Sequence, residues 1–177
     1  MLEFALDGLA TTDLAAQAVG LIAMACALTA FANRCDRRFY LLLIAAHGLF
    51  CLHFLMLGAL AGAGANLIAV ARAWLARDHR SPTVCLLLML AFAGMATLTV
   101  QAPIDLLAAV APILSTAVMF ALTGWRMRAG LLLCSGLWLA YNLSIGSWGG
   151  TLNDLVLISV NLVTIVRLLL GRQPRAA

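Results

Sequence analysis

A few polar and aromatic side chains stand inside long apolar runs, and these are the residues that could do chemistry. Asn66 and Asn161 each precede an arginine by eleven positions, at Arg77 and Arg172. Two amides at one depth could line a cavity, because each offers donors and an acceptor to a neutral hydroxylated solute. Alternatively, each amide bonds only a neighbouring helix.

A second candidate group combines aromatic and polar side chains on the same helix faces. Phe50 precedes His53 by three residues, and Trp138 precedes Tyr141 by three. Residues three apart share one face of a helix, and such rings could stack on the apolar face of a sugar. The alternative is a packing role with one satisfied hydrogen bond. Asn142, next to Tyr141, is a further candidate for binding a solute.

The sequence lacks the combinations of residues that metal binding and enzymatic catalysis require. His47 and His53 are six apart, which places them on different faces of a helix, so we expect no metal site. Asp105 and Asp154 lie near the ends of apolar runs and are interpreted as exposed loop-end acids rather than proton-coupling carboxylates. No nucleophile–base pair or carboxylate dyad stands at usable spacing, so we expect no enzyme and no cofactor.

The composition places the chain in a membrane. Hydrophobic residues make up 64%, charged residues 10%, and the mean hydropathy is +1.05, whereas soluble domains have about 25% charged residues. The 177 residues leave room for a single membrane domain, 1–177. The net charge of +4 comes from arginines in loops and at helix ends, so it does not indicate a nucleic-acid partner. The lipid bilayer is the expected partner, and a homodimer stays open.

Seven apolar runs are long enough to be membrane-spanning helices, given that about 20 residues cross a bilayer. They cover 14–32, 39–57, 59–76, 83–100, 104–123, 129–145 and 151–170. The basic residues, all eleven of them Arg, then fall on one side of the membrane. Arg72 and Arg167 do so by snorkelling from the ends of their helices. Because arginine marks the cytoplasmic side, the N-terminus is predicted outside and the C-terminus in the cytoplasm.

The chain also matches itself. The segment from Gly48 to His53 resembles the segment from Gly136 to Tyr141, 88 positions later. Asn66 recurs as Asn161, 95 positions later, which requires a length change in a loop. We therefore predict two parallel three-helix repeats, 13–76 and 104–171, joined by a linker helix at 83–100. Chance similarity between Leu- and Ala-rich helices is the alternative.

Further residues carry a resemblance to a known family. The chain is similar to the YgjV-type bacterial inner membrane proteins through the stretch Phe39 to Gly58, through Asn66 with Arg72, and through Trp138 with the Tyr-Asn pair that follows it. This resemblance implies a multi-pass protein of the bacterial inner membrane and little chemistry.

The three-plus-one-plus-three plan also resembles the SWEET and PQ-loop transporters. In those proteins paired Asn residues on the third and seventh helices, and paired aromatics on the second and sixth, face a substrate cavity. This chain has no intact Pro-Gln dipeptide, and it has few prolines. Pro112 should break one backbone hydrogen bond of the fifth helix and could act as a hinge.

Two functions follow as expectations. The first is a SWEET-like alternating-access carrier of a small neutral polar solute, such as a sugar or polyol. The second is a scaffold or assembly protein that binds membrane partners without transport.

Overall fold

The chain folds entirely into α-helices over the residues described by this computed structural model, which are 2–32, 36–78 and 81–171. The helices, in chain order, are α1 (Leu2–Ala32), α2 (Asp36–Met56), α3 (Leu60–Asp78), α4 (Pro82–Thr99), α5 (Asp105–Ala121), α6 (Gly124–Ser144) and α7 (Trp148–Leu169). Six of them begin and end within five residues of the predicted runs. The exception is α1, which extends back to Leu2 instead of starting near residue 14.

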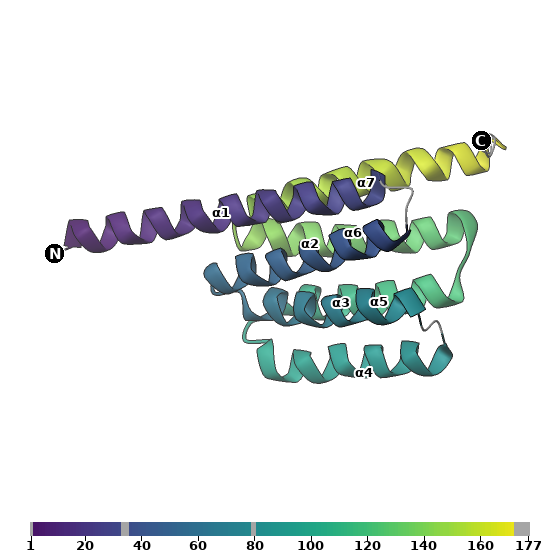
Figure 1. Ribbon diagram of the computed structural model, residues 1–177, viewed down its shortest axis with the longest axis horizontal. Helices are drawn as coiled ribbons and strands as arrows, with labels where there is room; N and C mark the ends of the chain where they lie inside the picture. Colours follow the sequence, from purple (N-terminus) through teal and green to yellow (C-terminus); the bar gives the residue numbers. More distant parts are fainter. Residues whose placement is uncertain (1, 33–35, 79–80, 172–177) are drawn as a thin grey trace.

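Successive helices run in opposite directions, so the two ends of the chain lie at opposite ends of the bundle (Figure 1). The connections 57–59, 100–104 and 145–147 therefore share one end, which we call the Arg-poor end. At the other, Arg-rich end, Arg37 and Arg38 begin α2, Arg126 lies near the start of α6, and Arg167 ends α7. Four further arginines of the predicted inner loops lie outside the described residues: Arg34, Arg80, Arg172 and Arg175.

Six of the helices, all except α4, form a ring in which each helix packs against the next. We call α1–α3 the first half and α5–α7 the second half. Within the halves α1 packs on α2, α2 on α3, α5 on α6 and α6 on α7, and between them α1 packs on α7 and α3 on α5. The fourth helix packs outside, on α3 and α5, at the lower edge of Figure 1.

Small residues line the interior, and large apolar residues face outward. Ala16, Ala23 and Ala30 of α1 are fully buried, and every residue of the stretch 61–66 in α3 is buried. In contrast, leucines such as Leu86, Leu98 and Leu169 are more than half exposed. This inside-out pattern is typical of membrane helices, which approach closely through small side chains while leucines face lipid.

Four helices are clearly long and apolar enough to cross a membrane: Asp13–Ala30, Arg37–Met56, Pro82–Thr99 and Trp148–Leu169. Two shorter apolar helices cover Leu60–Leu75 and Asp105–Met119. The chain is thus an all-helical, multi-pass protein. The remaining helix, α6, is not among these six; it carries Arg126 and Arg128 in its first turns and buries Ser135 and Asn142.

Two tight turns at the Arg-poor end share one geometry. Gly58 and Gly146 both have a positive φ, 71° and 68°, which a residue with a side chain rarely adopts. The backbone N–H of Ala59 donates to the carbonyl of Phe54, and the N–H of Ser147, 88 positions later, donates to that of Asn142. Helices α3 and α7 then start 88 positions apart, at Leu60 and Trp148.

Candidate functional site

His53 joins three helices at the Arg-poor end. Its ring is fully buried, with Nδ1 2.6 Å from the carbonyl oxygen of Ala16 and Nε2 2.8 Å from Oγ of Ser147. A carbonyl only accepts, so Nδ1 carries the hydrogen and Nε2 accepts from the Ser147 hydroxyl. Ser147 is the N-cap of α7, and its Oγ accepts the N–H of Gly150. The chain of bonds therefore ties α1 and α2 to the start of α7.

Tyr141 makes the corresponding connection from α6. Its side chain is fully buried, and its hydroxyl accepts the backbone N–H of Gly62, 3.0 Å away, in the first turn of α3. The first N–H groups of a helix lack partners within the helix. His53 and Tyr141, 88 positions apart, thus each reach across to the first turn of the third helix of the other half. Tyr141 does so directly because Ala59 occupies the position that corresponds to Ser147.

The predicted aromatic residues meet in the centre of the bundle. The Phe54 ring stacks on Trp138 with 6.2 Å between centroids, and on Phe50 at the same separation. Tyr141 lies beside both Phe54 and Trp138, at 6.1 and 5.9 Å. The structure therefore brings Phe50, Trp138, His53 and Tyr141 together, with Phe54 as the ring that joins the two helices.

The two predicted asparagines have different hydrogen-bond partners. The Oδ1 atom of Asn66 accepts from Nδ1 of His47 at 3.0 Å, and its Nδ2 donates to the carbonyl of Gly62 at 3.0 Å. Nδ2 of Asn161 donates to Leu157 within its own helix. The 88-residue spacing of the two turns and of the starts of α3 and α7 would pair Asn66 with Asp154, whereas the sequence analysis paired it with Asn161.

Asp154 corrects a second prediction, because it is not an exposed loop-end acid. It lies in the second turn of α7, only 4% exposed, and its Oδ2 accepts from Nδ2 of Asn142 at 2.8 Å. Asp105 does sit at a helix start, where its Oδ2 accepts the backbone N–H groups of Gln101 and Ala102. Asn142 is 98% buried and belongs to this polar pair rather than to the aromatic cluster.

The comparisons with known proteins agree with this membrane architecture. Residues 14–171 match a family described as Imp-YgjV, bacterial inner membrane protein. The chain belongs to the YgjV family. It is 32% identical over 153 residues to inner membrane protein YgjV of Escherichia coli strain K12, which covers 86% of this chain and 83% of that protein. No solved structure gives a significant match.

Membership of the YgjV family establishes the location. The chain is a multi-pass protein of the bacterial inner membrane, as predicted. The matched region includes every candidate residue, from Phe50 to Asn161.

Pro112, the predicted hinge of this YgjV-family chain, lies where α3, α4 and α5 meet. Its carbonyl accepts the hydroxyls of Ser115 and Thr116, and both hydroxyl oxygens accept from Nη1 of Arg72 at 3.2 Å. The Arg72 guanidinium also lies 5.6 Å from the centre of the Phe92 ring. Arg72 therefore binds α3 to its neighbours, whereas the sequence predicted only snorkelling toward the cytoplasm.

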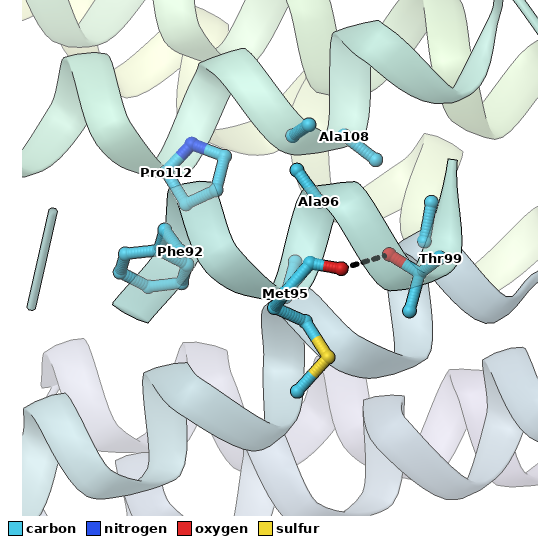
Figure 2. A pocket seen from close by; sticks show the side chains of 9 residues that line it. Phe92, Met95, Ala96, Thr99, Ala108 and Pro112 are labelled. Atoms are coloured by element: carbon cyan, nitrogen blue, oxygen red, sulfur yellow. Dashed lines mark hydrogen bonds between the residues drawn. The ribbon is translucent and has the colours of Figure 1, made fainter. Parts of the chain in front are cut away.

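A cavity of about 10 Å³ adjoins Pro112, between α3, α4 and α5. Phe92, Met95 and Thr99 of α4 face Ala108 and Pro112 of α5 across it (Figure 2). Proline leaves the carbonyl of Ala108 without its usual helical donor, and this volume suffices for about one water. A larger hollow of about 290 Å³ lies along the outer face of α7, between Ser159 and Arg167. Neither hollow is lined by Asn66 or Asn161.

Several structurally central residues escaped the sequence analysis. Gln17 donates from Nε2 to the carbonyl of Gly146 at 2.8 Å and accepts the N–H of Trp148 at 2.9 Å. Gly149 packs against the backbone of Gly20 so closely that a Cβ at residue 149 would overlap it. Gln17 could have been noticed as a polar residue within an apolar run. The contact between Gly149 and Gly20 left no recognisable pattern in the sequence.

Proposed function

We propose that the chain is an alternating-access carrier of a small neutral polar solute, built as two parallel three-helix repeats around a linker helix. The observation that carries this proposal is the pair of cross-connections made by His53 and Tyr141. Each bond joins a second helix of one half to the start of the third helix of the other. Hydrogen bonds of this kind can be exchanged for bonds to water or solute as the halves separate.

The repeat architecture is supported by the shared turn geometry. Both turns have a positive-φ glycine, the same backbone bonds and the same 88-residue spacing to the helix that follows. Gly62 packs against Phe54 and Gly150 against Asn142, again at corresponding positions. A parallel repeat of this kind relates the halves by an axis along the membrane normal, with the N-terminus outside.

The aromatic cluster is the proposed solute site. Phe50, Phe54, Trp138 and Tyr141 lie at the boundary between the halves, where opening would expose their faces. Aromatic rings offer apolar faces with polar edges, which suits the mixed surface of a sugar or polyol. His53, beside Phe50 and Phe54, supplies hydrogen-bonding groups next to this cluster.

Transport by proteoliposomes tests the proposal. Uptake of a panel of labelled sugars and polyols should be saturable for at least one solute. Trp138→Ala should abolish that uptake, since it removes the largest ring of the cluster. Trp74→Ala is the matched control, because Trp74 is 61% exposed on the outer surface of α3, and it should leave uptake unchanged. Equal loss in both variants, or uptake that never saturates, would contradict the carrier.

A scaffold remains the second candidate, and one observation favours it. His53, Tyr141 and Asn66 already have hydrogen-bond partners within the protein, and the cavity at Pro112 is no larger than a water molecule. If no solute of the panel crosses the membrane while Trp138→Ala lowers the thermal stability, the closed bundle is the functional form.

A further inference from the structure

Three buried side-chain atoms have no hydrogen-bond partner among the described residues, and all three are asparagine Oδ1 atoms on α6 and α7. They belong to Asn142, Asn153 and Asn161. Buried polar atoms nearly always have a partner, and a membrane interior supplies none. Two of these residues, Asn142 and Asn153, hydrogen-bond one carboxylate, that of Asp154, through their side chains.

Asp154 and Asn142 form the centre of this group. They are 4% and 2% exposed, and Nδ2 of Asn142 lies 2.8 Å from Oδ2 of Asp154. The Asn153 side chain also lies within hydrogen-bonding reach of the carboxylate. Gly150, one turn earlier on α7, makes room, since a Cβ there would overlap the Asn142 carboxamide.

The carboxylate has no cation beside it. Among the described residues no arginine forms an ion pair with Asp154, and the arginines of α2, α6 and α7 lie toward the Arg-rich end. A single charge within the membrane is costly unless a partner shares it. The side chains beside Asp154 are neutral amides, which bring no positive charge, and their unpartnered Oδ1 atoms are acceptors that would favour a cation.

We propose that Asp154, Asn142 and Asn153 bind a monovalent cation with the chemistry of Na⁺. An all-oxygen set of one carboxylate and two amide carbonyls suits a hard cation. One negative charge balances one positive charge, whereas a divalent ion would leave a net charge in the membrane. The oxygen and nitrogen of an amide are nearly interchangeable in position, so rotation of the Asn142 amide turns Oδ1 toward the ion.

The proposed ligands are the oxygen atoms of one carboxylate and two amides, rather than the nitrogen and sulfur atoms of His and Cys. Among the residues that the structure describes, no three His, Cys, Asp or Glu side chains lie close enough to hold a metal ion. The proposal goes beyond the carrier function and does not depend on it, since a cation bound at Asp154 would stabilise the bundle whether or not any solute crosses.

Thermal unfolding of the purified full chain in detergent tests the site. The melting temperature should rise with NaCl and saturate, relative to choline chloride at equal ionic strength and pH, because a ligand that binds only the folded state stabilises it. Asp154→Asn should abolish this rise. Asp105→Asn is the matched control, since Asp105 bonds only backbone N–H groups of the loop before α5 in the described residues, and it should keep the full Na⁺ response.

A second variant keeps the test decisive if Asp154→Asn does not fold. Asn142→Ala should retain the Na⁺ response but require about tenfold more Na⁺, a typical cost of losing one supporting group at a metal site. Equal melting curves in Na⁺ and choline would overturn the proposal, as would an unchanged Na⁺ response in both variants. A response to pH alone that Asp154→Asn removes would replace the cation site with a proton site. Failure of solute uptake would leave these melting curves unaffected.

Discussion

Asn66 and Asn161 show that two residues of the same type at similar depth can have different surroundings. Both polar atoms of the Asn66 amide make hydrogen bonds: Oδ1 accepts from His47 of α2, and Nδ2 donates to Gly62 of the same helix. Nδ2 of Asn161 bonds a carbonyl of its own helix, and its Oδ1 has no partner among the described residues. Equal behaviour of the two positions, which their spacing suggested, is therefore no longer expected.

Alanine variants at these two positions should differ in their free energy of unfolding. Asn66→Ala should lower the free energy of unfolding by about 1 kcal/mol, the scale of interhelical hydrogen bonds in membranes, because it leaves Nδ1 of His47 without an acceptor. Asn161→Ala should leave stability nearly unchanged. Thermal or denaturant unfolding in detergent measures both. Equal losses would mean that Asn161 has a partner that the structure does not show.

Ser147 should be among the most sensitive serines of the chain. Ser147→Ala removes the N-cap of α7, worth about 1 kcal/mol, and also leaves Nε2 of buried His53 unpaired, which costs about 1–3 kcal/mol. We expect a combined loss of about 2 kcal/mol in the free energy of unfolding. Ser144→Ala is the control, because Ser144 is exposed and bonds only Ala140; its change should stay within about 0.5 kcal/mol. Similar losses in both variants would contradict the role given to Ser147.

At the scale of helices, the contact between α1 and α7 depends on two glycines. A Cβ at Gly149 would overlap backbone atoms of Gly20, and a Cβ at Gly20 would lie 2.8 Å from the ring of His53. Close approach through small residues is the usual basis of tight helix packing in membranes. This contact therefore fixes the first helix against the last, beside the His53 connection.

A methyl group at this contact should force the helices apart. Gly149→Ala should lower the free energy of unfolding by about 2 kcal/mol, within the range of overpacked interiors. Gly136→Ala on α6 serves as the control, because nothing lies within 4 Å of a Cβ there, and it should be neutral or slightly stabilising. Unfolding in detergent compares the two. A stable Gly149→Ala protein would show that α1 and α7 are further apart than described.

At the scale of the whole molecule, the alternating helix directions and the one-sided arginines lead to the same topology. An odd number of crossings places the termini on opposite sides (Figure 1). Because α6 is not among the six apolar helices named above, it is the crossing that most needs a direct test. Its arginines lie at its first turns, so the rest of the helix stays available to the membrane.

Reporter fusions measure this topology in cells. Fusions after residues 35, 79, 127 and 175 should all be cytoplasmic, and a fusion after residue 146 should be extracytoplasmic. The physical reason is the arginine bias, which retains these loops on the cytoplasmic side. A cytoplasmic signal after residue 146 would mean that α6 does not cross, and an extracytoplasmic signal at any of the other four positions would break the seven-helix model.

The sequence by itself determined the membrane class, the seven helices and the residues at their ends. Apolar runs of sufficient length form helices in lipid because every backbone group must be bonded internally. Glycines such as Gly58 and Gly146 end helices because they alone adopt the required φ at no cost. The aromatic cluster was also predictable as a group, since Phe50 with His53, and Trp138 with Tyr141, share local helical faces.

Only the tertiary structure decided which polar groups meet. His53 bonds Ser147, 94 positions away, and this contact depends on how each helix is rotated about its axis. In a water-soluble protein the contrast between apolar and polar faces indicates that rotation. In lipid the outer face is as apolar as the interior, so the contrast is lost. For the same reason the sequence analysis took Asp154, near the end of an apolar run, for an exposed acid, whereas packing of α7 against α6 buries its carboxylate beside Asn142.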